Sequence, residues 1–144
     1  MMIQVFAAYF VTIFFAIIFK TSKNQLLISG FVGAVGWWGY LMVIHYDYSI
    51  VTGSFIGAFL VSLLANLFSK IRKSPVTIFQ IPGIIPLVPG MGMYKTLYAV
   101  IEEDYNLVAK QLFETLQIAG SIAVAMMLIF SLSTLIEQHI SKKA

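Results

Sequence analysis

Five long stretches of this sequence contain no charged residue, and they constrain its fold more than any other feature. They cover residues 1–19, 24–46, 48–69, 74–94 and 115–136 and are 19 to 23 residues long. About 20 consecutive apolar residues are enough to cross the hydrocarbon core of a bilayer. A typical soluble domain has about 25% charged residues, whereas this chain has 10%. The pattern therefore excludes a soluble enzyme, a nucleic-acid-binding protein and a disordered tail.

The stretches predict an all-α integral membrane protein with a single transmembrane domain over residues 1–144 and about five transmembrane helices. The expected helices cover residues 3–19, 26–44, 50–68, 76–101 and 105–137. We expect the fourth to be broken by a segment rich in proline and glycine. The last would be about 50 Å long at 1.5 Å per residue, so it is expected to project beyond the bilayer.

The positions of the charged residues predict an orientation. Seven of the nine basic residues form three clusters, at positions 20 and 23, 70 to 73, and 142 and 143, while most acidic residues lie in the other connections. With five crossings the basic clusters share one side, which the positive-inside rule places in the cytoplasm. The N-terminus is then outside and the C-terminus cytoplasmic. A fourth stretch that re-enters from one side would give four crossings and put the last basic cluster outside, against the rule.

Glycine spacing predicts where helices pack. The second expected helix has a glycine at every third position, and the third contains a G-x-x-x-G pair. Small residues of this kind let two helix backbones approach closely, so we favour packing over a substrate track. The expected helix-packing residues are Gly30, Gly33, Gly36, Gly39, Gly53, Gly57 and Gly120.

The segment Ile81–Gly90, IPGIIPLVPG, holds three of the four prolines. Each interior proline removes a backbone hydrogen bond and costs about 3 kcal/mol or more, so no continuous helix is expected here. Broken helices of transporters aim free N–H groups at anionic substrates. We expect a turn at Gly90 that uses the positive φ open to glycine, followed by a half-helix whose amides from Met91 to Met93 are free. A proline-kinked span or a re-entrant packing element is the alternative.

Two charged residues beyond this segment carry predictions of their own. Lys95 lies one turn into the half-helix, where an ionisable group at membrane depth is a functional-site hypothesis. Its long stem equally allows the ammonium group to reach the interface, and the sequence leaves both readings open. Asp104 is the predicted N-cap of the last helix. The charge-free stretches contain no carboxylate, and His45 and His139 are isolated, so we expect neither an enzyme nor a metal or cofactor site.

The segment Ile81–Gly90 and the residues MGMYKTL that follow it resemble the second-domain signature of the threonine/serine exporter (ThrE-like) family. The chain looks like the small, stand-alone subunit of its two-component members. The resemblance implies a bacterial inner-membrane exporter that pairs with a larger membrane subunit and carries threonine, serine or a dicarboxylate such as succinate. Lys95 is not part of the family pattern. The expected substrate-binding residues are Pro82, Gly83, Pro86, Pro89, Gly90, Met91, Gly92, Tyr94 and Lys95.

Two hypotheses of different classes follow. The first is one half of an exporter of small carboxylate-bearing metabolites, with the substrate contacted at the broken helix. The alternative is a non-transporting membrane scaffold, or assembly subunit, for a larger transporter partner. The expected partners are that larger subunit, the lipid bilayer and the carboxylate metabolite, but not nucleic acid. Whether copies of the chain also associate with one another is left open by the sequence.

Overall fold

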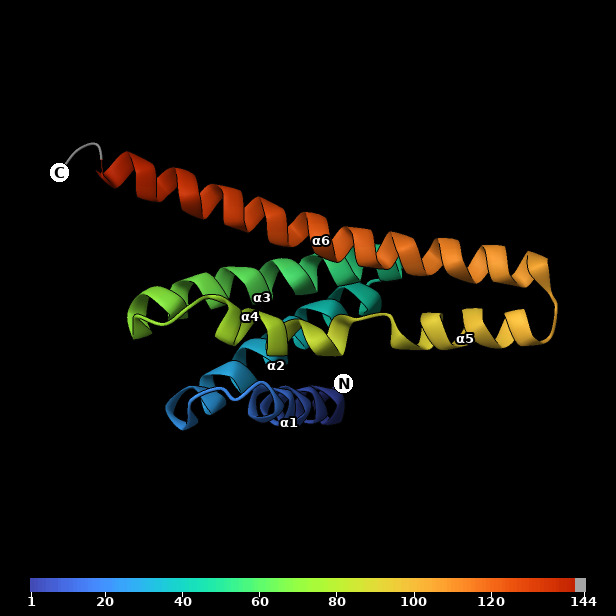
Figure 1. Cartoon of the computed structure of the whole chain (residues 1–144), viewed down its shortest axis with the longest axis horizontal. Helices are drawn as coiled ribbons and strands as arrows, with labels where there is room; N and C mark the ends of the chain where they lie inside the picture. Colours follow the sequence, from blue (N-terminus) through green and yellow to red (C-terminus); the bar gives the residue numbers. More distant parts are fainter. Residues whose placement is uncertain (142–144) are drawn as a thin grey trace.

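The computed structural model describes residues 1–141, and over that range the chain is helical and contains no strand (Figure 1). The elements are α1 (Met2–Ile18), α2 (Lys23–His45), α3 (Ile50–Arg72), α4 (Thr77–Ile84), the 3-10 helix η1 (Ile85–Leu87), α5 (Gly90–Ile101) and α6 (Tyr105–Ser141). The predicted all-α fold is confirmed.

Most of these helices are suited to a membrane. Within the described residues, α2, α3 and the part of α6 over Tyr105–Ile136 are long and apolar enough to cross one. The segment Thr77–Leu87 and α5 form a pair bent by 51° that together would give a fourth crossing. The apolar helix α1 has 17 residues, at the short end of the range of about 17–25 that spans a bilayer. The predicted number of about five is consistent with this set.

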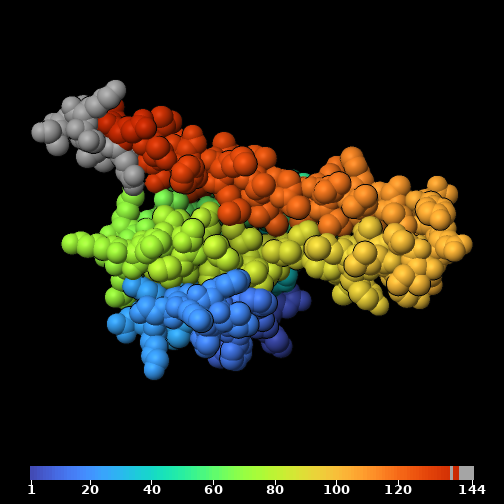
Figure 2. All heavy atoms as spheres, viewed as in Figure 1, coloured from blue at the N-terminus to red at the C-terminus, as the bar shows by residue number. Residues whose placement is uncertain are grey.

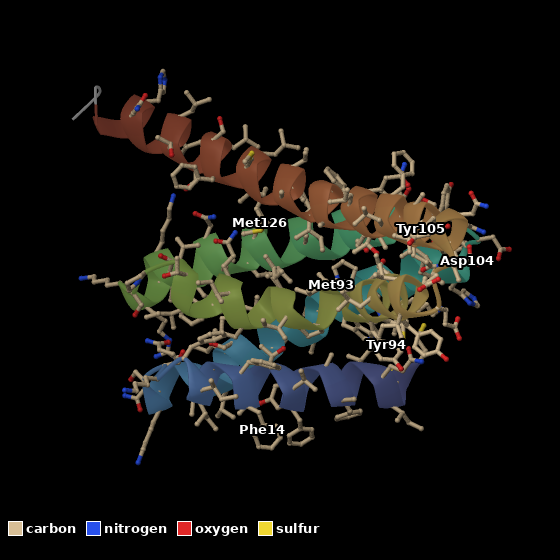
Figure 3. All side chains as sticks on the ribbon, turned by 45° about the vertical axis from the view of Figure 1, so that its right-hand side comes forward. Phe14, Met93, Tyr94, Asp104, Tyr105 and Met126 are labelled. Atoms are coloured by element: carbon tan, nitrogen blue, oxygen red, sulfur yellow. The ribbon has the colours of Figure 1, made fainter. Side chains whose placement is uncertain are left out.

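The core lies between α2, α3, α4, η1 and the second half of α6. Its buried side chains are Val32, Ala58, Val61, Ala65, Phe79, Ile84, Leu87, Ile122 and Ala125. The helix α1 covers α2 and also contacts α4 and η1. Phe14, on its outer face, is exposed and points away from the other helices (Figure 3). Apolar side chains thus cover both the interior and the outside, as expected of a protein surrounded by lipid.

A second region extends past the end of this bundle. There α5 and the first half of α6 form an antiparallel hairpin (Figures 1 and 2), and α5 contacts no other described helix than α6. The 37 residues of α6 give about 55 Å at 1.5 Å per residue, against about 35 Å for α3. Asp104 accepts a hydrogen bond from the N–H of Leu107 at 3.0 Å, which confirms the predicted N-cap at the turn of the hairpin (Figure 3).

The glycines of α2 face two different neighbours. A Cβ added to Gly30 or Gly33 would collide with side chains of α1, and one added to Gly36 or Gly39 would collide with side chains of α3. Because an α-helix has 3.6 residues per turn, a line of residues spaced by three drifts around its surface. One row of glycines therefore serves both contacts.

The closest approach of α2 and α3 joins two of these predicted glycines. A Cβ on Gly57 would lie 2.9 Å from the carbonyl oxygen of Gly36, and one on Gly36 would lie 3.2 Å from that of Gly57. Gly53 packs on Tyr40 of α2. Gly120 differs from its prediction, because a Cβ there meets nothing within 4 Å in the described chain. This glycine lies on α6 where no neighbouring helix covers it.

The helix α4 continues through Pro82, so the predicted break in the segment does not occur at this proline. Proline has no N–H, so the carbonyl oxygen of Ile78, one turn earlier, loses its usual donor. The hydroxyl of Ser29, a fully buried residue of α2, lies 3.3 Å from that oxygen and donates to it. A side chain of the neighbouring helix thus replaces the missing hydrogen bond and keeps α4 helical.

Two of the basic connections lie at the same end of the bundle. The connection between α1 and α2, which carries Lys20, lines a cavity together with Thr77 at the start of α4. Nearby, the amide of Gln25 donates to the hydroxyl of Ser74 in the connection between α3 and α4, at 3.2 Å. Figure 1 shows the C-terminal end of α6 on this side and the turn of the hairpin on the other.

Candidate functional site

The helix breaks at Pro89, between η1 and α5. Pro89 has φ −75° and ψ 57°, and the N–H of Gly90 donates to the carbonyl oxygen of Val88 at 2.7 Å. These are the features of an inverse γ-turn, for which the proline ring already sets φ. No glycine in the described chain has a positive φ, so the expected turn at Gly90 is wrong. Pro89 makes the turn, and Gly90 is the first residue of α5.

The turn leaves two backbone N–H groups free at the start of α5. The N–H of Met93 donates to the carbonyl oxygen of Pro89 at 3.1 Å, so the expectation that this amide is free is wrong. The N–H groups of Met91 and Gly92 have no acceptor in the described chain. Together with the helix dipole they favour a negative charge at this point.

A cavity of about 310 Å³ surrounds the break, a volume within the range of small-molecule sites. It lies where α2 ends and α3 begins, at the junction of the bundle and the hairpin. The side chains and backbone of five elements form its wall. They are Trp37, Tyr40, Ile50, Ser54, Pro86, Leu87, Val88, Pro89, Gly90, Met91, Gly92, Lys95, Gln111, Glu114, Thr115 and Ile118.

Six of the nine predicted substrate-binding residues line this cavity. They are Pro86, Pro89, Gly90, Met91, Gly92 and Lys95. Gly92 also lets α5 approach α6, because a Cβ there would collide with the hydroxyl of Thr115. A Cβ on Gly90 would meet nothing within 4 Å. The predicted segment and the structural cavity therefore coincide at the break itself.

Three predicted residues lie elsewhere. Pro82 and Gly83 are buried in the bundle, where a Cβ on Gly83 would lie 2.9 Å from Val61 and 3.2 Å from Val32. Tyr94 is exposed on the side of α5 that faces away from α6 (Figure 3) and stacks on Tyr98. In this structure Pro82 and Gly83 serve packing, and Tyr94 does not reach the cavity.

Sequence reasoning missed the cavity residues contributed by α2, α3 and α6. Trp37 and Tyr40 stack with their ring centroids 4.9 Å apart, and aromatic residues near a helix end usually mark the membrane interface. Glu114 looks like one of the polar residues of an amphipathic helix. The sequence carries no signal that brings these residues to Pro89, because only the packing of α2, α3 and α6 around η1 does so.

Two polar groups in the cavity wall have no partner. Ser54 is 2% exposed, yet its hydroxyl makes no hydrogen bond with the described residues, and the indole N–H of Trp37 is buried without an acceptor. The buried hydroxyls of Ser29 and Ser62, by contrast, are both bonded to other helices. Buried polar groups are normally hydrogen-bonded, so these two residues stand out among the apolar side chains of this wall.

The cavity also contains one charge of each sign. Lys95 on α5 and Glu114 on α6 both line it, and both side chains are exposed. Neither forms a hydrogen bond or an ion pair with another described residue. Two unpaired opposite charges beside free backbone N–H groups can hold a small polar molecule by its own charges.

The fold and the cavity define a multi-pass α-helical membrane protein with a cavity at a broken helix whose wall contains both apolar and charged residues, and broken helices build the binding sites of many transporters. The family model described as threonine/serine exporter, ThrE, matches residues 4–132. The chain therefore belongs to the threonine/serine exporter (ThrE) family, a family of transporters, and the resemblance of its Pro-Gly segment is confirmed. No solved structure matches the chain.

Proposed function

We propose that the chain is the small subunit of a two-component exporter and that it contacts a small carboxylate-bearing substrate at the break between η1 and α5. The observation that carries the proposal is the cavity that the break forms with Lys95 in its wall. A substrate carboxylate would accept hydrogen bonds from the free N–H groups of Met91 and Gly92, with the Lys95 ammonium group beside it. Threonine, serine and a dicarboxylate such as succinate all carry that group.

The need for a larger partner rests on how little of the cavity the chain encloses. The hairpin forms one side of the cavity, and within the described residues α5 contacts no helix other than α6. On α5, the side chains of Met91, Tyr94 and Leu97 are each more than half exposed. A transport path needs walls on all sides across the bilayer. The larger subunit of the family would supply the missing wall, and export would require both chains.

We propose that the chain sits in a bacterial inner membrane with its N-terminus outside and its C-terminus in the cytoplasm. The shared position of the basic connections at one end of the bundle supports this. Single cysteines at Ser22 and Glu103 of the cysteine-free chain test it. A membrane-impermeant thiol reagent should label Glu103→Cys in intact cells and Ser22→Cys only after lysis. The reverse labelling would contradict the orientation.

Export of threonine or of succinate from cells that express both subunits tests the function, and export of either compound supports it. Lys95→Met should lower export about tenfold or more, as expected for the loss of a charge-assisted contact worth about 1.5–3 kcal/mol, with normal copurification of the larger subunit. Gly90→Val, which adds a side chain to the cavity wall, should do the same. Gly120→Val is the control, because its Cβ also meets nothing but lies outside the cavity.

The same variants separate transport from a scaffold role. If Gly90→Val and Lys95→Met prevent copurification of the larger subunit, the segment serves assembly, and the scaffold hypothesis replaces the proposal. If both variants assemble and export normally, the break does not contact the substrate. Normal export by cells that express the larger subunit alone would show that this chain is not part of the transport path.

A further inference from the structure

We propose that Glu114 is the specificity-determining residue of the cavity, where it binds the ammonium group of a zwitterionic substrate and excludes a dicarboxylate. This inference rests on the proposed function, since it assigns the substrate class of the same site. The helix that follows the break supplies only positive charge to the cavity, and a negative charge comes from another helix. The cavity wall carries one anion as well as one cation.

The two charges come from different helices. Lys95 lies on α5, next to the free N–H groups of Met91 and Gly92, while Glu114 lies on α6 and faces the same cavity. A carboxylate group fits the α5 side, where positive charge gathers. A second carboxylate of the same ligand would then meet Glu114, and like charges at close range repel each other.

An amino acid avoids that repulsion because its two charged groups have opposite signs. Its carboxylate would lie at α5 and its ammonium group at Glu114. The two residues do not pair with each other in the described chain, so each remains available to a ligand. A site that includes a repulsive group against the competitor discriminates more strongly than one built from attraction alone.

The residues next to Glu114 on α6 bring no other charge into the cavity. Gln111 and Thr115, on adjacent turns of α6, line the cavity but are neutral, and the Thr115 hydroxyl donates to the carbonyl oxygen of Gln111 at 2.7 Å. Lys110 precedes Glu114 by one helical turn and does not line the cavity. The hydroxyl of Ser54, a cavity-lining residue that makes no hydrogen bond within the described chain, offers the ligand a further hydrogen bond.

Proteoliposomes that contain this chain and the larger subunit test the proposal, with radiolabelled threonine as substrate and succinate as competitor. The wild-type complex should transport threonine with little competition from succinate. Glu114→Gln should lower threonine transport about tenfold, equivalent to about 1.4 kcal/mol. Glu114→Arg places two cations in the cavity and should make succinate an effective inhibitor. Glu103→Gln, the same chemical change in the turn of the hairpin, is the matched control and should behave as the wild type.

Copurification of the larger subunit with each variant ensures that a loss reflects the site and not assembly. If Glu114→Gln disrupts assembly, Glu114→Asp, which keeps the charge, is measured in its place. Threonine transport that succinate does not inhibit in this variant supports the proposal. Inhibition of that transport by succinate overturns it. A Glu114→Gln complex that assembles and transports threonine as well as Glu103→Gln overturns the inference and leaves the proposed function intact. Equal wild-type transport of succinate and threonine also overturns it. If the wild-type complex transports neither compound, the proposed function fails and the inference fails with it.

Discussion

The bundle of α1 to α4 and the hairpin of α5 and α6 differ in how many of their glycines are required by a close contact. In the bundle, a Cβ on Gly33, Gly36 or Gly57 would collide with a neighbouring helix. In the hairpin region, Gly92 has a contact of the same kind with Thr115, but Gly90 and Gly120 have open space where a Cβ would lie. The bundle is therefore a closely packed unit in which glycine is required by contact. The hairpin is a lightly packed extension.

The cavity lies where these two regions meet, and the contrast explains why. Close packing fixes one wall, formed by α2, α3 and η1, while the hairpin contributes Glu114 on α6 and Lys95 on α5, which contacts no other described helix than α6. Binding sites often combine a rigid scaffold with a less stable element that can move. The comparison predicts that substitutions in the bundle affect folding and that substitutions in the hairpin affect transport.

The largest effect is expected at the closest contact of the bundle. Gly57→Val would place a Cβ 2.9 Å from the carbonyl oxygen of Gly36 and 2.9 Å from Leu87. A backbone atom cannot turn away as a side chain can, so α2 and α3 must separate. We expect a loss of about 3 kcal/mol or more, measured by chemical unfolding in detergent with the fluorescence of Trp37 and Trp38 of α2.

Gly120→Val is the matched control for that variant, because it makes the same chemical change without a neighbour within 4 Å. It should change the unfolding free energy by no more than about 1 kcal/mol. Equal losses in the two variants would contradict the contrast between the regions. They would also show that Gly120 packs against something other than the described chain.

The positions of the helices could be predicted from the sequence, whereas many of the contacts between them could not, and the difference has a physical reason. A bilayer requires long apolar helices, so the charge-free stretches identify them from composition alone. The spacing of glycines in α2 likewise predicts close packing. The path of α4 through Pro82 could not be predicted, because the hydroxyl that compensates for the proline belongs to Ser29, which is distant in sequence. Long-range partners of this kind carry no local signal.

The same limit applies to the site. Proline and glycine revealed where the helix breaks, because their backbone chemistry acts locally. The prediction that Gly90 makes the turn was wrong, since Pro89 alone provides the φ and ψ of an inverse γ-turn. Glu114 and Ser54 join the site only through tertiary packing. Sequence therefore identified one wall of the cavity and could not identify the wall opposite it.

A smaller effect is expected for the hydrogen bond that allows α4 to contain a proline. Ser29→Ala leaves the carbonyl oxygen of Ile78 without a donor and should cost about 1 kcal/mol, as for other hydrogen bonds between membrane helices. Pro82→Ala restores the N–H within α4, so in that background Ser29→Ala should cost much less. Unfolding of the two single variants and the double variant gives the coupling energy directly.

A second acceptor of the same hydroxyl bears on that cycle. The single proton of the Ser29 hydroxyl is shared with the carbonyl oxygen of Gln25 in its own helix, at 3.1 Å, so in the Pro82→Ala background the hydroxyl keeps that acceptor while Ile78 regains a backbone donor. A coupling energy near zero would contradict the role of Ser29 in compensating for Pro82. It would mean that α4 tolerates the proline through its packing alone.

The most local effect is expected at the start of α6, in the hairpin. Asp104→Ala removes the acceptor of the Leu107 N–H and should cost about 1 kcal/mol of local helix stability, while Asp104→Asn should retain most of it. Amide hydrogen exchange over residues 105–110 should become faster in the alanine variant, with no change over α2 and α3.

The equivalent change at the cap of α3, Ser49→Ala, removes the acceptor of the Thr52 N–H. If the bundle is the more cooperative unit, amide hydrogen exchange should become faster along the whole of α3 after Ser49→Ala. Faster exchange in the first turn of α3 alone would show that both regions open in the same local way.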